Sequence, residues 1–420
     1  MTPFELTALL MTLVAVVGWL NVKTLRMPHG VAMLCLGIVV ALLLVALRHT
    51  TFGGGFVDGI IGTVSRIDFV TTVVGIMLPF LLFAGAMQVD LGEMRRRWLS
   101  IDALATLGVA GSVLIVGVGT WLIARFLRID LSLPWALVFG ALISPTDPVA
   151  VLATVKHGKL SKTLQVILQG EALFNDGVGI VVFTALLAFA TGIGDSSPLH
   201  AIADVAIQAA GGLAFGVVAA MLTIRAMGTM DEFAVEVSMT IALAMAIYAA
   251  ALALHLSGAI AVVGAGMMFG GERAKRAMAG ETEGYVKGLW TLIDEIRNAL
   301  LFLLLGVKML TVPFYAGQFG LIAAVVVLVI ISRFAVVLPW GGGGGGGAYF
   351  RMRHAERGAT LILGWGGLHG ALSLALALSL PQGPERALIL AVTYAVVAFS
   401  ITAQGLTFTP LTRLLRRPDR

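Results

Sequence analysis

The sequence predicts an all-α integral membrane protein with about thirteen transmembrane helices. The chain has 420 residues, of which 59% are hydrophobic and only 12% are charged, and its mean hydropathy is +0.98. Apolar runs of roughly 20 residues, long enough to cross about 30 Å of hydrocarbon, recur from end to end. The polar segments between them are too short for a water-soluble domain. We therefore expect one membrane domain over residues 1–420.

Thirteen apolar runs lie between charged or turn-forming breaks. The first run has no basic leader and no small-residue cleavage pattern, so it is expected to be a retained span. The single cysteine, Cys35, falls inside an apolar run, which excludes a disulfide within the chain. The expected spans lie near residues 4–22, 28–47, 70–89, 102–124, 133–155, 163–190, 200–224, 233–254, 256–270, 286–307, 313–340, 357–380 and 387–411.

The basic residues predict the orientation of these spans. Of the 28 Lys and Arg residues, 20 lie in loops after odd-numbered spans or at the C-terminus, and six lie on the opposite side. Arg297 and Arg333 lie inside spans. The side rich in basic residues faces the cytoplasm in membrane proteins, which places the N-terminus outside and the C-terminus inside. This distribution explains the net charge of +5, so nucleic acid is not an expected partner.

Two of the spans are expected to be discontinuous helices. Span 5 contains the motif Ser144–Pro148, whose two prolines remove amide donors and interrupt a helix. Span 12 contains the glycine-rich segment Gly364–Gly370, for which close helix packing is the alternative. Paired interruptions at membrane depth are typical of a transporter's substrate site. Because an offset of seven spans reverses direction, spans 1–6 and 8–13 would form inverted repeats connected by span 7.

Among the ionisable residues within the apolar spans, where charge is costly and usually functional, four stand out. Asp147 lies in the break of span 5, Glu171 and Asp176 lie in span 6, and Arg333 lies in span 11. Glu171 and Asp176 are five residues apart and so point about 140° apart on a helix. We expect Asp147 and Asp176 to bind the substrate, and Glu171 and Arg333 to form a structural ion pair. Asn175 adds a neutral amide beside Asp176.

Carboxylates at a helix break form an oxygen-rich site suited to a bare alkali cation. Ser144 and Thr146 add hydroxyl and carbonyl oxygens. Burial disfavours an empty, charged carboxylate, so the same Asp is expected to bind either a cation or a proton. If the protein switches between its outward-open and inward-open conformations only when that Asp is neutralised, the cation and the proton must move in opposite directions. For Asp294, Glu295 and Arg297 in span 10, an entrance funnel and a local ion pair both stay open.

These motifs resemble the bacterial sodium/proton antiporters of the NhaP type, relatives of the animal sodium/hydrogen exchangers. The resemblance covers roughly residues 141–410, while the first hundred residues match mainly by hydropathy. The matching segments occur in the family's order and are Ser144–Val151, Gly170–Glu171, Asn175–Asp176, Asp294–Glu295, Leu301–Phe302, Gly366–Leu368 and Gln404–Thr407.

The resemblance implies two inverted six-helix repeats with crossed discontinuous helices. It implies an ion-binding core that includes about residues 70–190 and 286–411, and a dimer-forming scaffold that includes about 1–60 and 200–270. A homodimer in the bacterial inner membrane, with a periplasmic N-terminus and no cofactor, is the expected form.

Residue by residue, the resemblance implies Asp176 as the principal carrier of cation and proton, with Asp147 and the Thr146 carbonyl beside the ion. Glu171 would pair with Arg333. The Asn-Asp pattern at 175 and 176 resembles the electroneutral branch, so one Na⁺ (or Li⁺ or K⁺) would exchange for one H⁺. The full set of expected ion-binding residues is Asp176, Asp147, Thr146, Asn175 and Glu171.

Three features depart from the family pattern or stand outside it. Ala172 replaces the usual Ser after the Glu and removes one hydroxyl ligand. His369 replaces the usual Arg of span 12, and since histidine titrates near neutral pH, it could add pH dependence or be a neutral packing residue. Seven glycines at 341–347 cannot form a stable helix and are given no function.

Features of the sequence also bear on two other classes of function. Residues 192–195 fit the Gly-x-Gly-Asp pattern of intramembrane aspartyl proteases, but Asp195 falls in a polar loop and the chain has no Tyr-Asp partner, so an enzyme is not expected. A sodium-coupled organic-anion symporter of similar architecture stays the alternative. It would need a cationic pocket, for which His369, Arg297 and Arg333 are the candidates.

Overall fold

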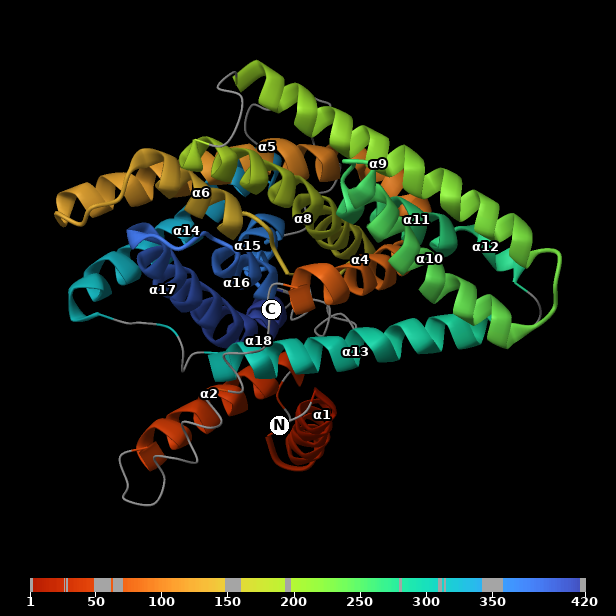
Figure 1. Cartoon of the computed structure of the whole chain (residues 1–420), viewed down its shortest axis with the longest axis horizontal. Coiled ribbons are helices and arrows are strands. Elements are labelled where there is room, and N and C mark those ends of the chain that lie inside the picture. Colours follow the sequence, from red (N-terminus) through yellow and green to blue (C-terminus); the bar gives the residue numbers. More distant parts are fainter. Residues whose placement is uncertain are drawn as a thin grey trace, which may run out of the picture.

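The structure is a computed structural model that describes residues 3–25, 27, 29–48, 62, 71–147, 160–192, 198–278, 282–308, 312, 315–341 and 358–415. Within these ranges the chain is helical and contains no strand (Figure 1). Six of the described helices are long and apolar enough to cross a membrane unaided. Other expected spans are shorter or interrupted helices. The fold is therefore the all-helical integral membrane fold that the sequence predicts.

The first half of the chain supplies spans 1–6 in the expected order. A π-helical turn, η1 (Asn21–Leu25), follows the first helix, and another, η2 (Thr71–Met77), precedes the third. The helices are α1 (Pro3–Leu20), α2 (His29–Arg48), α4 (Leu78–Met87), α5 (Leu91–Phe126), α6 (Leu133–Ile143) and α8 (Lys162–Thr191).

The second half begins with the connecting span and continues with spans 8–13. The last expected span is divided by a π-helical turn, η5 (Ser400–Gln404), and a 3₁₀ turn, η4 (Ala316–Gln318), precedes α14. The helices are α9 (Pro198–Met227), α10 (Phe233–Ala253), α11 (Gly258–Gly270), α12 (Glu272–Ala277), α13 (Thr282–Lys308), α14 (Phe319–Gly341), α15 (Ala359–Trp365), α16 (Ala371–Leu378), α17 (Pro384–Phe399) and α18 (Gly405–Leu415). Gly341 ends α14, and residues 342–347 of the glycine run lie outside the described residues.

Helix α5 begins well before the expected boundary near residue 102. Asp90 caps it, because its side chain accepts hydrogen bonds from the amides of Gly92 (2.9 Å) and Glu93 (3.1 Å). Lys162, at the start of α8, lies 2.6 Å from the same carboxylate, and together these donors hold the pKa of Asp90 below its usual value. The charged run at 95–97 is therefore a helical extension beyond the apolar part of the span.

The helices pack in two groups. In one group, α2 packs along α13, and α11 packs against α9, α10 and α4. In the other, α5 packs against α6, α8 and α14, and α16 packs against α17. Figure 1 shows α9, α10 and α11 together on one side and α6, α14, α15 and α17 on the other.

Close contact between α2 and α13 depends on glycine. A Cβ atom added to Gly306 would lie 2.6 Å from the Cα of Gly37, so both positions need a residue without a side chain. Within this group α13 is thereby held firmly to α2, which matters for the residues that α13 contributes to the site.

Candidate ion-binding site

Two helix breaks contact one another in the structure. Helix α6 ends at Ile143, and the chain between α15 and α16 is not helical. The amide of Asp147 donates a hydrogen bond of 2.6 Å to the carbonyl of Leu368, which joins the two breaks directly. A Cβ on Gly370 would lie 2.7 Å from the Cβ of Asp147, so glycine permits this approach. The prediction of two crossed discontinuous helices is confirmed, and Pro148 lies outside the described residues.

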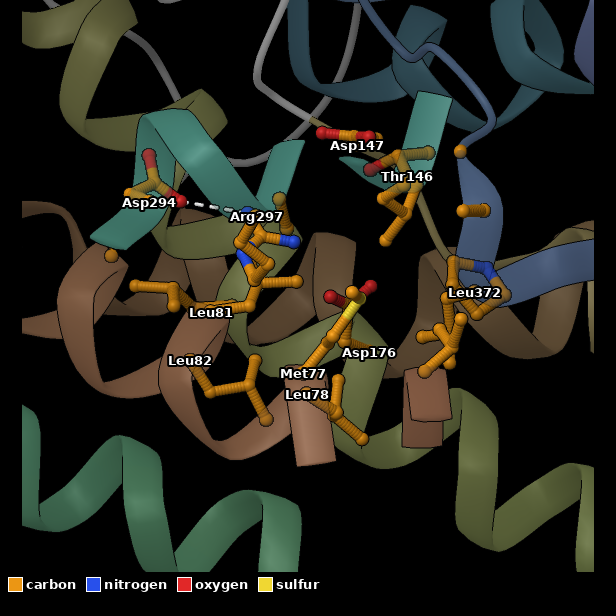
Figure 2. A pocket seen from close by; sticks show the side chains of 18 of the residues that line it. Met77, Leu78, Leu81, Leu82, Thr146, Asp147, Asp176, Asp294, Arg297 and Leu372 are labelled. Atoms are coloured by element: carbon orange, nitrogen blue, oxygen red, sulfur yellow. Dashed lines mark hydrogen bonds and ion pairs between the residues drawn. The ribbon is translucent and has the colours of Figure 1, made fainter. Parts of the chain in front are cut away.

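A cavity lies beside these breaks, and acidic side chains lie around it (Figure 2). Thr146 and Asp147 line it from the end of α6, and Asp176 lines it from α8. The cavity offers about 70 Å³ of room for water-sized molecules, enough for a small cation with a few waters. Much of the remaining wall is apolar and comes from η2 and α4, through Met77, Leu78, Leu81 and Leu82.

The helix ends around the cavity complement its charges. The carboxylate of Asp147 lies against Gly370, the residue that precedes the first turn of α16. The N-terminus of a helix carries partial positive charge, so it favours a carboxylate there. Asp176 is only 7% exposed. Two carboxylates and Thr146 therefore line one cavity, and oxygen ligands of this kind are the ones that alkali cations prefer.

Helix α8 directs Glu171, Asn175 and Asp176 to different partners. Asp176 points into the cavity, as Figure 2 shows. Asn175 lies behind Thr146, because its amide nitrogen donates to the Thr146 hydroxyl at 2.7 Å and its amide oxygen lies 3.5 Å from the Thr146 amide. Asn175 therefore holds the residue that lines the cavity and does not line the cavity itself.

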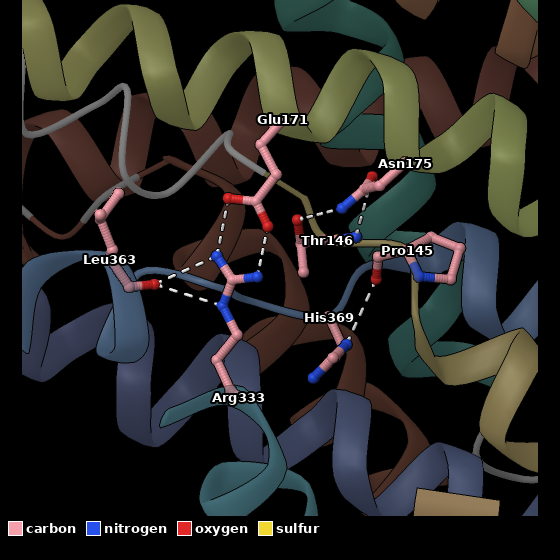
Figure 3. A network of polar contacts seen from close by, with 7 residues as sticks. All are labelled: Pro145, Thr146, Glu171, Asn175, Arg333, Leu363 and His369. Atoms are coloured by element: carbon pink, nitrogen blue, oxygen red, sulfur yellow. Dashed lines mark hydrogen bonds and ion pairs between the residues drawn. The ribbon is translucent and has the colours of Figure 1, made fainter. Parts of the chain in front are cut away.

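Glu171 is paired with Arg333 of α14. The two side chains form a bidentate ion pair, Nη1 to Oε1 and Nη2 to Oε2, the second at 2.8 Å. Arg333 also donates to the carbonyl of Leu363 from Nη2 (3.1 Å) and Nε (3.2 Å) (Figure 3). Gly367 lies against the guanidinium and leaves no room for a Cβ. The pair thus ties α8 to α14 and to the last turns of α15.

His369 lies in the second break and contacts the first. Its Nδ1 is 3.3 Å from the carbonyl of Pro145 (Figure 3). Its amide donates to the Ser400 hydroxyl at 2.9 Å. The residue is 5% exposed. The contact with Pro145 gives a partner to a carbonyl of the non-helical segment that follows α6. Whether His369 also modulates the response to pH stays a prediction.

The expected site residues therefore divide between two cavities. Asp176 and Asp147 line the larger one, whereas Glu171 and Asn175 line a smaller one behind it, together with Arg333 and His369. Thr146 lines both. The structure therefore places Glu171 and Asn175 behind the larger cavity, although the sequence grouped them with the expected ion-binding residues. Their role in ion binding stays a prediction.

Two charged residues of α13 also line the larger cavity, which the sequence did not establish. Arg297 donates to Asp294 at 2.7 Å, and both line the cavity with Asp176 (Figure 2). Helix α13 starts at Thr282, four residues before the expected span, so Arg297 lies fifteen residues from its beginning, about 22 Å along the axis. The signal available in the sequence was an arginine inside an apolar span, because such a residue needs a partner.

Comparison with known proteins agrees with this geometry. The sequence-family model of the transmembrane region of the sodium/hydrogen exchangers matches residues 10–414. The Na⁺/H⁺ antiporter NhaP of Pseudomonas aeruginosa is 38% identical over 97% of this chain and 96% of its own, and NhaH of Halobacillus aidingensis is 30% identical over 94% and 93%. The solved sodium proton antiporter MjNhaP1 of Methanocaldococcus jannaschii shares the fold with a TM-score of 0.76 and 19% identity over the whole of both chains. This multi-pass membrane protein therefore belongs to the sodium/hydrogen exchanger family.

Proposed function

We propose that this chain is a secondary antiporter that exchanges Na⁺ for H⁺ across a membrane. The observation that carries the proposal is the cavity that Asp176, Asp147 and Thr146 line beside the crossed helix breaks. Its room for only a few water-sized molecules suits a small ion. The two relatives named above, both Na⁺/H⁺ antiporters by name, align along nearly the whole chain and support the same activity.

Cation and proton compete for Asp176 in this mechanism. An unpaired carboxylate surrounded by protein costs several kcal/mol, so Asp176 is stable with a bound cation or with a proton. The protein switches between its outward-open and inward-open conformations when Asp176 is neutralised by either ligand, and it does not switch while Asp176 is charged. A cation released on one side is then replaced by a proton that returns, and the two fluxes are coupled. Because Asn175 is neutral, α8 carries one exchanging charge, and the exchange is one Na⁺ for one H⁺.

The two groups of helices provide the moving parts. The ion-binding core comprises α5, α6, α8 and α14–α18, and the scaffold comprises the helices that pack with α2, α11 and α13. Packing supports this division, which assigns η2, α4 and α13 to the scaffold, whereas the residue ranges expected from the sequence include them in the core. The cavity lies where the groups meet, since α8 and α16 line one part of it and α4 and α13 line another. A relative shift of core and scaffold would open it alternately to the two sides.

The finer cellular assignments are also proposals. The distribution of Lys and Arg supports a periplasmic N-terminus and a cytoplasmic C-terminus in the bacterial inner membrane. The scaffold is the expected contact between two copies in a homodimer. Exchange of this kind would contribute to the homeostasis of sodium and pH.

The alternative of an organic-anion symporter has less support. Arg333 is bound to Glu171 and lines the smaller cavity with His369, and Arg297 is bound to Asp294. These three residues therefore do not combine into a cationic pocket. An organic anion would have to approach Asp147 and Asp176, which repel it.

Proton movement in proteoliposomes tests the proposed exchange. When NaCl is added outside liposomes that contain the purified protein and a pH-sensitive dye, we expect the interior to become alkaline as sodium enters and protons leave. LiCl and KCl added in the same way measure selectivity, which depends on the oxygen missing at Ala172, a residue of the cavity wall. A membrane potential imposed with valinomycin should not change the sodium-driven rate. If no alkali cation moves protons, the proposed function is wrong.

A further inference from the structure

Arg297 brings a fixed positive charge into a cavity that is proposed to bind a cation. Its side chain is 6% exposed, and its Nη2 donates to Asp294 (2.7 Å) and to Asn298 (2.5 Å). Its Nε is buried without a hydrogen-bond partner among the described residues. Figure 2 shows Arg297 and Asp176 on different elements around the same space.

Three acidic residues and one arginine line the cavity. Asp147 comes from the break of α6, Asp176 from α8, and Asp294 and Arg297 from α13, while the wall residues from η2, α4 and α16 carry no charge. Asp147 and Arg297 line the same cavity as Asp176, so the charges of both lie close to it. Since Arg297 is hydrogen-bonded to Asp294, it only partly offsets the two carboxylates that face the ion. The cavity therefore contains the positive charge of Arg297, and any Na⁺ or H⁺ that binds there lies close to that charge.

We propose that Arg297 is a positioning residue that sets the affinities of the cavity for cation and proton together. Its charge repels both ligands of the carboxylates, so it weakens their binding to a similar degree and favours release. Asp294 moderates this repulsion by pairing with the guanidinium. Because α13 packs with the scaffold and Asp176 with the core, the repulsion would change as the two groups move. The inference rests on the proposed exchange at Asp176.

Opposite effects of two substitutions distinguish this role from a structural one. Arg297→Gln removes a positive charge, so we expect the sodium concentration for half-maximal exchange to fall about tenfold. For the same reason, the acid-side flank of the pH profile should move about one unit towards alkaline pH. Asp294→Asn leaves Arg297 unneutralised and should shift both quantities in the opposite direction. Arg297→Lys keeps the charge and should stay near wild type, and the double variant Arg297→Gln/Asp294→Asn should return towards it.

A local ion pair without an electrostatic effect on the cavity predicts another pattern. Both single variants would then lose the same contact, with a similar loss of thermal stability and no shift in sodium affinity or pH profile. That result, or shifts in the same direction, would overturn the inference. Sodium-dependent thermal stabilisation of the detergent-solubilised protein provides a second measure of affinity.

The result stays decisive if one variant does not fold. Should Arg297→Gln be impossible to purify, Asp294→Asn alone decides, since weaker sodium binding supports the inference and unchanged binding overturns it. An incorrect role for Arg297 can also be distinguished from an incorrect proposed function. If Asp176→Asn abolishes exchange while Arg297→Gln shifts nothing, only the role of Arg297 is wrong.

Discussion

Replacing Asp176 with Asn is expected to reduce sodium-driven proton movement to the level of protein-free liposomes. Asn has the same shape but neither binds a proton at neutral pH nor neutralises a cation. Asp176 lines the cavity from α8, and no other residue of that helix does so with a charge. The variant should fold normally, because it removes a buried charge and leaves the packing of α8 unchanged. Proteoliposome flux is the measurement.

Asp231→Asn is the matched control for this prediction. Asp231 lies in the exposed turn between α9 and α10, so the same chemical change there should leave the rate of exchange unchanged. Size-exclusion profiles of both variants should match wild type. Sodium-coupled proton movement that survives Asp176→Asn at the wild-type rate would show that another group carries the ions.

Breaking the buried ion pair is expected to have the second largest effect, on stability. Glu171→Gln leaves the Arg333 guanidinium buried, with Leu363 as its remaining acceptor among the contacts of the pair. Removing one partner of a buried pair typically costs about 3–5 kcal/mol, because the other charge is left uncompensated. Thermal unfolding in detergent should show this loss. The sodium affinity of the folded protein should change little, since Glu171 does not line the larger cavity.

Glu283→Gln supplies a comparison on the same scale. Glu283 forms an ion pair with Lys287 one turn away on α13, and both side chains are substantially exposed. Exposed pairs of this kind contribute about 0.3–0.5 kcal/mol. A loss of stability in Glu171→Gln no larger than in Glu283→Gln would contradict a structural role for the buried pair.

Much of the fold could be predicted because the bilayer imposes a strong constraint on sequence. The apolar runs located the spans and their order. The helix boundaries could not be placed as well. Helix α5 begins at Leu91 because Asp90 caps it, and this polar contact lies outside the apolar run that defines a span.

The site could be predicted where a residue type has one structural consequence, as proline has when it interrupts a helix. Pro145 and the glycines of 366–370 located the two breaks, and buried carboxylates located the cavity. Which carboxylate faces which partner depends on tertiary packing. Spacing separated Glu171 from Asp176, but only the structure places Asn175 behind Thr146.

For the charges of α13 the sequence left an entrance funnel and a local ion pair both open, and the structure shows the ion pair of Arg297 with Asp294 in the cavity wall. In the sequence, Asp294 and Arg297 lie three residues apart within the first few turns of the expected span, a spacing that an ordinary helical ion pair explains equally well. Their position in the cavity follows from how α13 packs against α2 and α4, which no local pattern encodes. Similarly, the contact of His369 with the Pro145 carbonyl arises only when two distant breaks meet.

Competition between sodium and protons for one carboxylate is the central claim, and the pH dependence of sodium affinity tests it most directly. The half-maximal sodium concentration for exchange is measured in proteoliposomes at several pH values, with equal pH on both sides at the start. Competition at one site predicts that this concentration rises about tenfold for each unit by which the pH falls below the binding midpoint of the proton. A half-maximal concentration that stays constant while the maximal rate falls would show that the two ions bind at separate sites.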